Sequence, residues 1–171
     1  MAILEIVTVP DPVLKKQAQE LKDFNLEIEK IVNNMAETMY HAPGVGLAAN
    51  QVGLLKQIAV IDVSPPEEEK NLIVLINPRI VNAEGELPGE EGCLSVPELK
   101  VEMDRAEKVK VVAKGLRGED IEIDAEGLLA RAIQHELDHL MGKTILDRIG
   151  RLKRRMYLDN LKKKRAGLEP S

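Results

Sequence analysis

The chain has 171 residues, of which 44% are hydrophobic and 31% charged, so it has enough apolar side chains for a core and is not generally disordered. Its only aromatic residues are Phe24, Tyr40 and Tyr157, which argues against modules that stack nucleic-acid bases on aromatic rings. No apolar run approaches the roughly 20 residues that span a bilayer, and the first residues lack a secretion signal. One cysteine, Cys93, excludes an internal disulfide. We therefore expect a cytoplasmic monomer that binds neither DNA nor membranes.

The first expected element is a helix over residues 26–40, where apolar residues recur at helical spacing after Asn25, the predicted N-cap. Two strands are expected next, at 57–63 and 72–76, because these short apolar runs are separated by a polar turn that contains proline.

Shorter segments follow in which apolar and charged residues alternate, at 99–103, 109–111 and 121–123. The sequence Gly-Leu-Arg-Gly at 115–118 predicts a hairpin between the last two. Alternation with a period of two is typical of sheets with one buried face, which indicates antiparallel pairing.

Residues 125–141 (AEGLLARAIQHELDHLM) have the strongest helical pattern, with Asp124 as the expected N-cap and Gly142 just past the end. Apolar residues lie on most sides of this helix: Leu128, Leu129, Ala132, Ile133, Leu137, Leu140 and Met141. Such a helix belongs in a core. The predicted fold is α+β, with small antiparallel sheets packed around this central helix and a C-terminal helix after it.

The charge is distributed unevenly. Residues 151–165 hold eight Lys or Arg against Asp159 alone, a net charge of +7, so the remainder of this chain of net charge −5 carries −12. We expect a catalytic domain at 1–148 and a basic helix or tail at 149–171. Either a polyanionic partner or simple solvation of a terminal helix explains the basic segment.

Two histidines on the apolar helix indicate a metal site. His135 and His139 are one helical turn apart, so their imidazoles lie on one face and reach a common point. The spacing His-Glu-x-x-His is that of zinc hydrolases, in which the histidines bind the metal and the glutamate acts as a base. Glu136 is the glutamate in this pattern.

A third ligand is required, and the sequence offers several candidates. Metzincin-type proteases place a third histidine six residues after the second, but Ile145 occupies that position. Proteases with a downstream acidic ligand would use Asp159 or Glu169, both in the polar tail. Cys93 by itself is more often a small buried hydrophobe than a ligand, but beside an incomplete metal site it becomes the better candidate. Two imidazoles and one thiolate leave a position open for water, which is typical of a catalytic metal.

Three segments, in order, resemble the signatures of the peptide deformylase family, whose members remove the formyl group from new bacterial polypeptides. They are GVGLAANQ at 44–51, EGCLS at 91–95 and HELDH at 135–139. The first segment alone is better explained as an ordinary, tightly packed turn, but the ordered trio is specific. The resemblance extends from the N-terminal region to about residue 148.

The resemblance implies a role for each matching residue. The metal ligands fall on Cys93, His135 and His139, and the catalytic glutamate on Glu136. The groups that stabilise the oxyanion fall on the side chain of Gln51 and the backbone N–H of Leu94. Substrate-lining positions fall on Val45, Gly46, Leu128 and Ala132. Arg131 is a departure, since the family often has an apolar residue there, lining the methionine pocket.

The resemblance also implies one divalent metal, with Fe²⁺ as the usual working ion. By coordination preference a Cys-His-His set suits Zn²⁺, and Ni²⁺ or Co²⁺ can occupy such a site in purified protein. Expected partners are N-formyl-methionyl peptides and nascent chains, with ribosome contact through the basic tail. Two alternatives stay open: a His-Glu-x-x-His metalloendopeptidase, and a non-enzymatic, ribosome-associated metal-binding protein.

Overall fold

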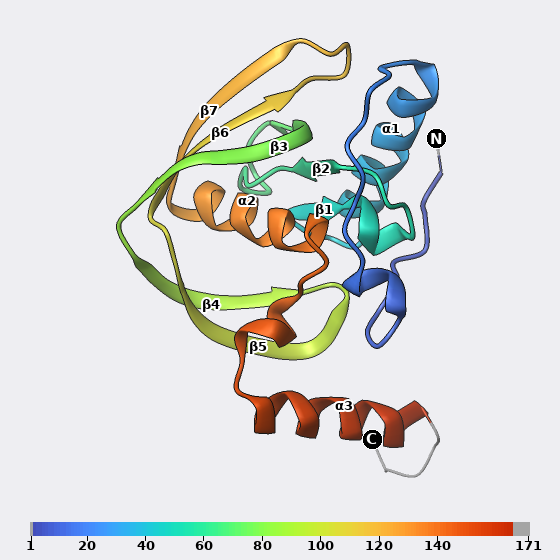
Figure 1. Ribbon diagram of the computed structural model, residues 1–171, viewed down its shortest axis with the longest axis vertical. Coiled ribbons are helices and arrows are strands. Elements are labelled where there is room, and N and C mark those ends of the chain that lie inside the picture. Colours follow the sequence, from blue (N-terminus) through green and yellow to red (C-terminus); the bar gives the residue numbers. More distant parts are fainter. Residues whose placement is uncertain (1, 166–171) are drawn as a thin grey trace.

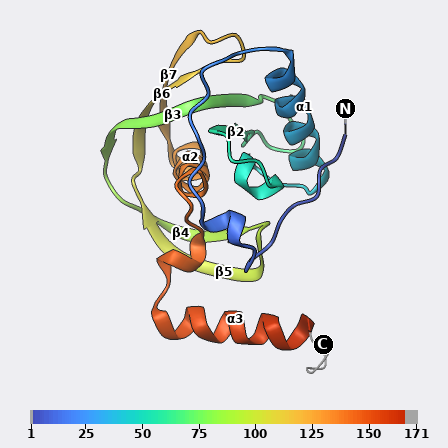
Figure 2. The ribbon, with the colours of Figure 1, turned by 45° about the vertical axis from the view of Figure 1, so that its right-hand side comes forward.

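The computed structural model describes residues 2–165 (Figure 1). Its helices and strands are α1 (Leu26–His41), β1 (Gly46–Ala48), β2 (Ile58–Ile61), β3 (Ile73–Glu84), β4 (Leu87–Cys93), β5 (Val96–Arg105), β6 (Lys108–Lys114), β7 (Asp120–Glu126), α2 (Gly127–Leu140) and α3 (Arg151–Arg165). Five strands form an antiparallel sheet in the order β1-β2-β3-β6-β7, and β4 pairs with β5 in a second antiparallel sheet. The helix α2 lies between the two sheets, as Figure 2 shows along its axis. The predicted α+β class is confirmed.

The larger sheet is covered on both faces near its centre. Ile58 and Val60 of β2 pack in a core with α1, whereas Ile61 of the same strand packs in a second core with Ile133 of α2. Because side chains alternate across a strand, a strand covered on both sides is apolar at every position. This explains the continuous apolar run that predicted β2, all four residues of which are buried.

The predictions of the first helix with its N-cap and of the hairpin at 115–118 are confirmed. The side chain of Asn25 accepts a hydrogen bond from the Ile28 N–H (3.2 Å) and caps α1. The Gly115 and Gly118 turn joins β6 to β7, with the Gly115 N–H donating to the carbonyl of Glu119 (2.9 Å).

Besides β1, which no sequence pattern predicted, two strands differ from the prediction. The expected strand at 72–76 continues to Glu84, because a bulge next to Asn77, which has a φ of 52°, accommodates a proline inside β3. The strand β4 was missed, since its sequence LPGEEGC contains a proline and two glycines, which disfavour strands. It forms by tertiary pairing with β5.

The central helix begins later than predicted, and its predicted N-cap is wrong. Asp124 and Ala125 belong to β7, where they pair with β6, and the chain turns into α2 at Gly127 with a φ of 63°. Pairing with β6 therefore overrides the helical preference of these residues. Leu128 and Met141 belong to the apolar residues that predict a buried helix, but they are 56% and 52% exposed.

The predicted C-terminal helix is present as α3 and packs below β5 (Figure 1). The Tyr157 hydroxyl donates to the Pro97 carbonyl (2.7 Å), and Leu158 and Leu161 pack with the core under β5.

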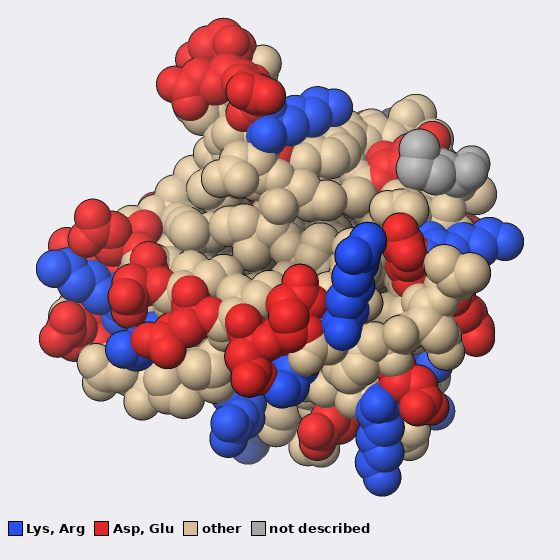
Figure 3. All heavy atoms as spheres, turned by 90° about the horizontal axis from the view of Figure 1, so that it is seen from above, with Lys and Arg blue, Asp and Glu red and all other residues tan. Residues whose placement is uncertain are grey.

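Seen from the opposite end of the molecule, acidic side chains gather in several groups (Figure 3). Among residues 2–165 no helix is long and apolar enough to cross a membrane.

Candidate active site

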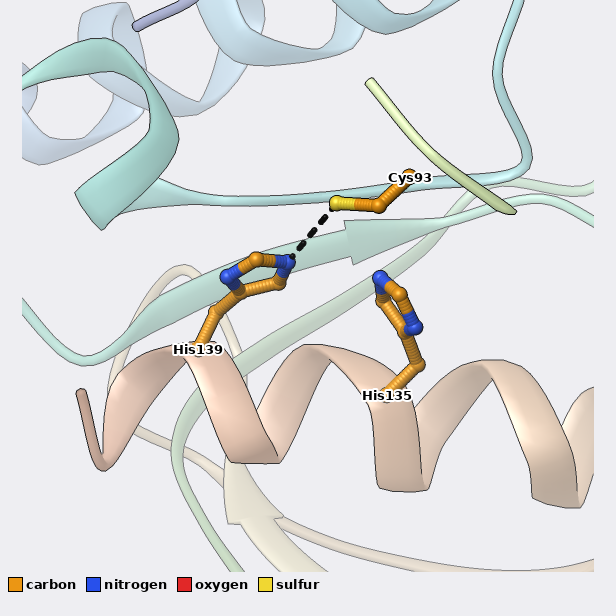
Figure 4. Close-up of side chains that lie close together, drawn as sticks. All are labelled: Cys93, His135 and His139. Carbon is orange, nitrogen blue, oxygen red and sulfur yellow. Dashed lines mark hydrogen bonds between the residues drawn. The ribbon is translucent and has the colours of Figure 1, made fainter. Parts of the chain in front are cut away.

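The three predicted metal ligands converge although they come from distant parts of the sequence. Cys93 ends β4, and His135 and His139 project from α2 toward it (Figure 4). Their ligand atoms all lie within 4.8 Å of one another, and Cys93 Sγ is 3.3 Å from His139 Nε2. Sulfur and nitrogen ligands lie about 2.0–2.3 Å from a transition metal, so atoms at these separations fit one shared cation. We call the point between these three ligand atoms the metal position.

No other group of three such ligands gathers within residues 2–165. Asp159, the carboxylate that a protease-like site would use, is exposed on α3 and is not part of the group. Glu169 lies outside the described residues. The third member of the candidate group is therefore a thiol, and such a donor set would suit Fe²⁺, Co²⁺, Ni²⁺ or Zn²⁺.

The imidazole of His135 is oriented by a buried carboxylate. Glu91 Oε1 lies 3.0 Å from His135 Nδ1, which leaves Nε2 directed to the metal position. Glu91 also accepts two hydrogen bonds from Arg105, from Nε at 2.8 Å and from Nη2 at 2.9 Å. Burial alone would raise the pKa of Glu91, but the hydrogen bonds from Arg105 and His135 hold that pKa far below its usual value. The carboxylate is thus ionised and fixes the ring of His135, an arrangement common at metal sites.

Sequence reasoning did not assign this supporting network. Glu91 stands in the EGCLS segment and Asp138 in HELDH, but Arg105 carries no local signal. Arg105 Nη1 donates to Asp138 Oδ2 (2.9 Å), and Arg148 binds both oxygens of the same carboxylate. Asp138 therefore joins an ion network away from the metal position.

The two histidines have opposite protonation preferences in the metal-free chain. Burial lowers the pKa of His139 well below its usual value, and the nearby charge of His135 lowers it further. Burial also acts to lower the pKa of His135, but the charge of Glu136 and the hydrogen bonds with Cys93 and Glu91 raise it well above the usual value. His135 must lose this proton to bind a metal.

Glu136 is buried beside the metal position. Glu136 is only 3% exposed, and its Oε1 has no hydrogen-bond partner among the described residues. Burial raises its pKa to about 7. A carboxyl group that titrates near neutral pH and has an unoccupied oxygen is suited to accept and return a proton.

Gln51 presents its amide N–H groups to the site. The backbone N–H of Ala48 donates to Gln51 Oε1 (3.0 Å), which fixes the orientation of the amide. Gln51 Nε2 donates to Ser95 Oγ (3.0 Å) and lies 3.7 Å from Cys93 Sγ. The 3₁₀ turn at Ala49–Val52 that follows β1 carries this side chain, so the first motif places a donor at the metal position.

A pocket of about 390 Å³ opens beside these groups. It is lined by predicted site residues from all three motifs and from the preceding turns of α2: Val45, Gly46, Gln51, Cys93, Leu94, Leu128, Ala132, His135 and Glu136. His139 is fully buried behind them. The structure therefore brings every predicted site residue into or directly behind one pocket, and Arg131 lines it as well.

Gly46 permits the close approach of Glu136. A Cβ atom at residue 46 would lie 2.4 Å from Glu136 Oε2. We expect Gly46→Ala to displace this carboxylate and to reduce kcat/KM about 100-fold, the effect typical of a misplaced catalytic group, while metal content is unchanged. Steady-state kinetics and metal analysis check this. Gly150→Ala is the control, because no atom lies within 4 Å of that Cβ; equal activity of the two variants would contradict the prediction.

A thiol, two imidazoles and a buried carboxylate, placed by an α+β fold at one pocket, define a metallohydrolase of the His-Glu-x-x-His class. The family model for polypeptide deformylase matches residues 3–155, and the chain belongs to this family.

Individual relatives agree with this assignment. The peptide deformylase of Thermodesulfovibrio yellowstonii is 53% identical over 116 residues, which cover 68% of this chain and 69% of that protein. The peptide deformylase of Syntrophobacter fumaroxidans is 48% identical over 118 residues, with 69% of each chain covered. Among solved structures, that of the Ehrlichia chaffeensis enzyme in complex with actinonin superposes with a TM-score of 0.91 at 38% identity, covering 96% of this chain and 98% of that one.

Proposed function

We propose that Cys93, His135 and His139 hold the metal with which this peptide deformylase removes the formyl group from the N-terminal formyl-methionine of nascent polypeptides. The observation that supports this most strongly is the convergence of one thiol and two imidazoles beside the buried carboxyl group of Glu136.

Within this proposal, different residues of the chain carry out different steps of the hydrolysis. A divalent metal held there would act as a Lewis acid and lower the pKa of water toward about 7. Glu136 takes the proton from the attacking water and later delivers it to the departing α-amine, so that formate and a free N-terminus result. The Gln51 amide and the Leu94 backbone N–H donate to the oxyanion. Losing one such donor typically reduces the rate about 10²–10³-fold.

The pocket residues hold the methionine side chain in this proposal. Leu128 and Ala132 come from the face of α2 that leads to His135, while Val45 and Gly46 come from the other wall. The apolar character of these four residues suits an unbranched apolar side chain.

We propose Fe²⁺ as the metal that works in the cell, on the strength of the family resemblance. The test is formate release from formyl-Met-Ala by protein purified without oxygen, with metal analysis of the same sample. We expect activity in proportion to bound Fe²⁺, loss of that activity in air, and survival in air when Ni²⁺ or Co²⁺ is substituted. Stoichiometric metal without formate release would refute the function, whereas equal lifetimes in argon and air would refute only the choice of iron.

We propose further that the enzyme works as a cytoplasmic monomer on nascent chains, in contact with neither DNA nor membranes. The lone thiol at the metal position supports a reducing compartment, since oxidation would destroy this ligand. The division into a catalytic domain at 1–148 and a basic segment at 149–171 stays a prediction.

The exposed cations of α3 are proposed to contact the ribosome. We expect the double substitution Lys153→Glu with Lys163→Glu, at two exposed positions, to weaken co-sedimentation with ribosomes and reduce its salt dependence. Turnover of formyl-Met-Ala should be unchanged. Lys22→Glu with Lys30→Glu reverses two exposed charges elsewhere and is the matched control. Unaltered co-sedimentation of the α3 variant would remove the support for ribosome contact.

A further inference from the structure

Arg131 is a buried charge next to the metal position that the proposed chemistry does not use. It lies one turn before His135 on α2, so Arg131, His135 and His139 form a single stripe along the helix. Arg131 is 8% exposed. A buried guanidinium is costly unless its donors are paired, and both Nη1 and Nη2 of Arg131 have acceptors.

The partners of Arg131 come from both strands of the smaller sheet. Nη1 lies 2.6 Å from Glu91 Oε2 and 3.4 Å from the carbonyl of Met103, and Nη2 donates to the carbonyl of Leu87. Leu87 and Glu91 belong to β4 and Met103 to β5. One side chain thus ties α2, which carries two ligands, to the strand that ends at the third, Cys93.

The backbone of β4 is shaped to receive this guanidinium. A Cβ atom at Gly89 would lie 3.0 Å from Arg131 Cζ, so glycine is the residue that lets the strand lie against the side chain. The same strand was missed by sequence reasoning because of its glycines. For Gly89, the contact with Arg131 of α2 accounts for the glycine.

Arg131 also completes the environment of the carboxylate that orients His135. Glu91 Oε2 accepts from Arg105 and Arg131, whereas Oε1 accepts from Arg105 and faces His135 Nδ1. The carboxylate is therefore fixed from both sides. Without Arg131, Glu91 would keep only its contacts with Arg105 and with the His135 ring that it orients.

We propose that Arg131 is a positioning residue for the metal: through Glu91 it orients His135, and through the carbonyls of Leu87 and Met103 it sets the position of Cys93 relative to α2. This rests on the proposed function, because it takes Cys93, His135 and His139 as the ligands. It assigns to Arg131 a role distinct from that of a pocket wall. Outer partners that orient metal ligands commonly change metal affinity 10–100-fold.

The test measures the metal rather than turnover. Arg131→Met keeps an unbranched stem but removes the guanidinium. We expect its affinity for Zn²⁺, measured by competition with a chelator, to fall about 10–100-fold. The Co²⁺-substituted variant should show altered thiolate-to-metal and d–d absorption bands. Arg131→Lys keeps a positive charge but cannot reach all three acceptors of the guanidinium, so its affinity for Zn²⁺ should be intermediate. It replaces Arg131→Met in the test if that variant does not fold.

Two comparisons make the outcome decisive. Arg154→Met removes a half-buried partner of Asp147, outside the candidate metal group, and should leave both metal readouts as in the wild type. In a Glu91→Gln background, Arg131→Met should weaken Zn²⁺ binding by less than it does alone, because part of its effect passes through Glu91.

The proposal is overturned if the Arg131 variants bind Zn²⁺ and Co²⁺ as the wild type does and change only KM for formyl-Met peptides, the result expected of a pocket wall. Full additivity with Glu91→Gln would also overturn the coupling through Glu91. Failure of the wild type to show thiolate-to-Co²⁺ absorption would instead reject the ligand set, and with it the proposed function.

Discussion

Cys93→Ala is expected to lose its metal and, with it, formate release. Removing a residue that only orients a ligand typically weakens metal binding 10–100-fold, so removing a ligand should exceed about 100-fold. The sulfur lies 3.3 Å from His139 Nε2, and without it the group keeps only its two imidazoles. Metal content after gel filtration and formate release measured on the same sample check the prediction.

Asp159→Ala provides the matched control for the third ligand. A metalloendopeptidase with a downstream carboxylate would lose its metal in this variant and retain it in Cys93→Ala. Because Asp159 is exposed on α3, we expect Asp159→Ala to keep its full metal content and full activity, and Cys93→Ala to lose both. Retention of metal by Cys93→Ala would reject the proposed ligand set.

Glu136→Gln is expected to retain its metal but to lose about 10²–10⁴-fold in the rate of formate release, the range contributed by a general acid–base group. Glutamine has almost the same shape but accepts no proton. Since Glu136 is not among the three ligands, metal analysis should match the wild type. Glu102→Gln, at an exposed position on β5, is the control. Undiminished formate release by Glu136→Gln with full metal occupancy would contradict the assignment of Glu136 as the base.

The same carboxylate predicts a pH dependence. Burial raises the pKa of Glu136 to about 7 in the metal-free chain, and a neighbouring cation would lower it. A base must be ionised, so kcat/KM should decrease with acidification through an ionisation at or below pH 7. The residual activity of Glu136→Gln should lack this ionisation. A pH–rate profile of that variant with the same acidic limb would assign the limb to another group.

The local parts of this protein follow from its sequence because they depend on neighbouring residues. The helical period alone places His135 and His139 on one face, and the N-cap at Asn25 and the hairpin at 115–118 follow from side chains and backbone within a few positions. The motifs themselves identify the residue types that hydrolysis requires. These features need no knowledge of distant contacts.

Only the tertiary structure decided which distant residues meet. Cys93 lies 46 positions before His139, and it reaches the imidazole because β4 forms against β5 and is held on α2 by Arg105 and Arg131. Asp124 is a strand residue rather than a helix cap for the same kind of reason. Pairing across a sheet and burial of a shared charge are properties of the assembled chain, and here they outweigh the preferences of individual residues.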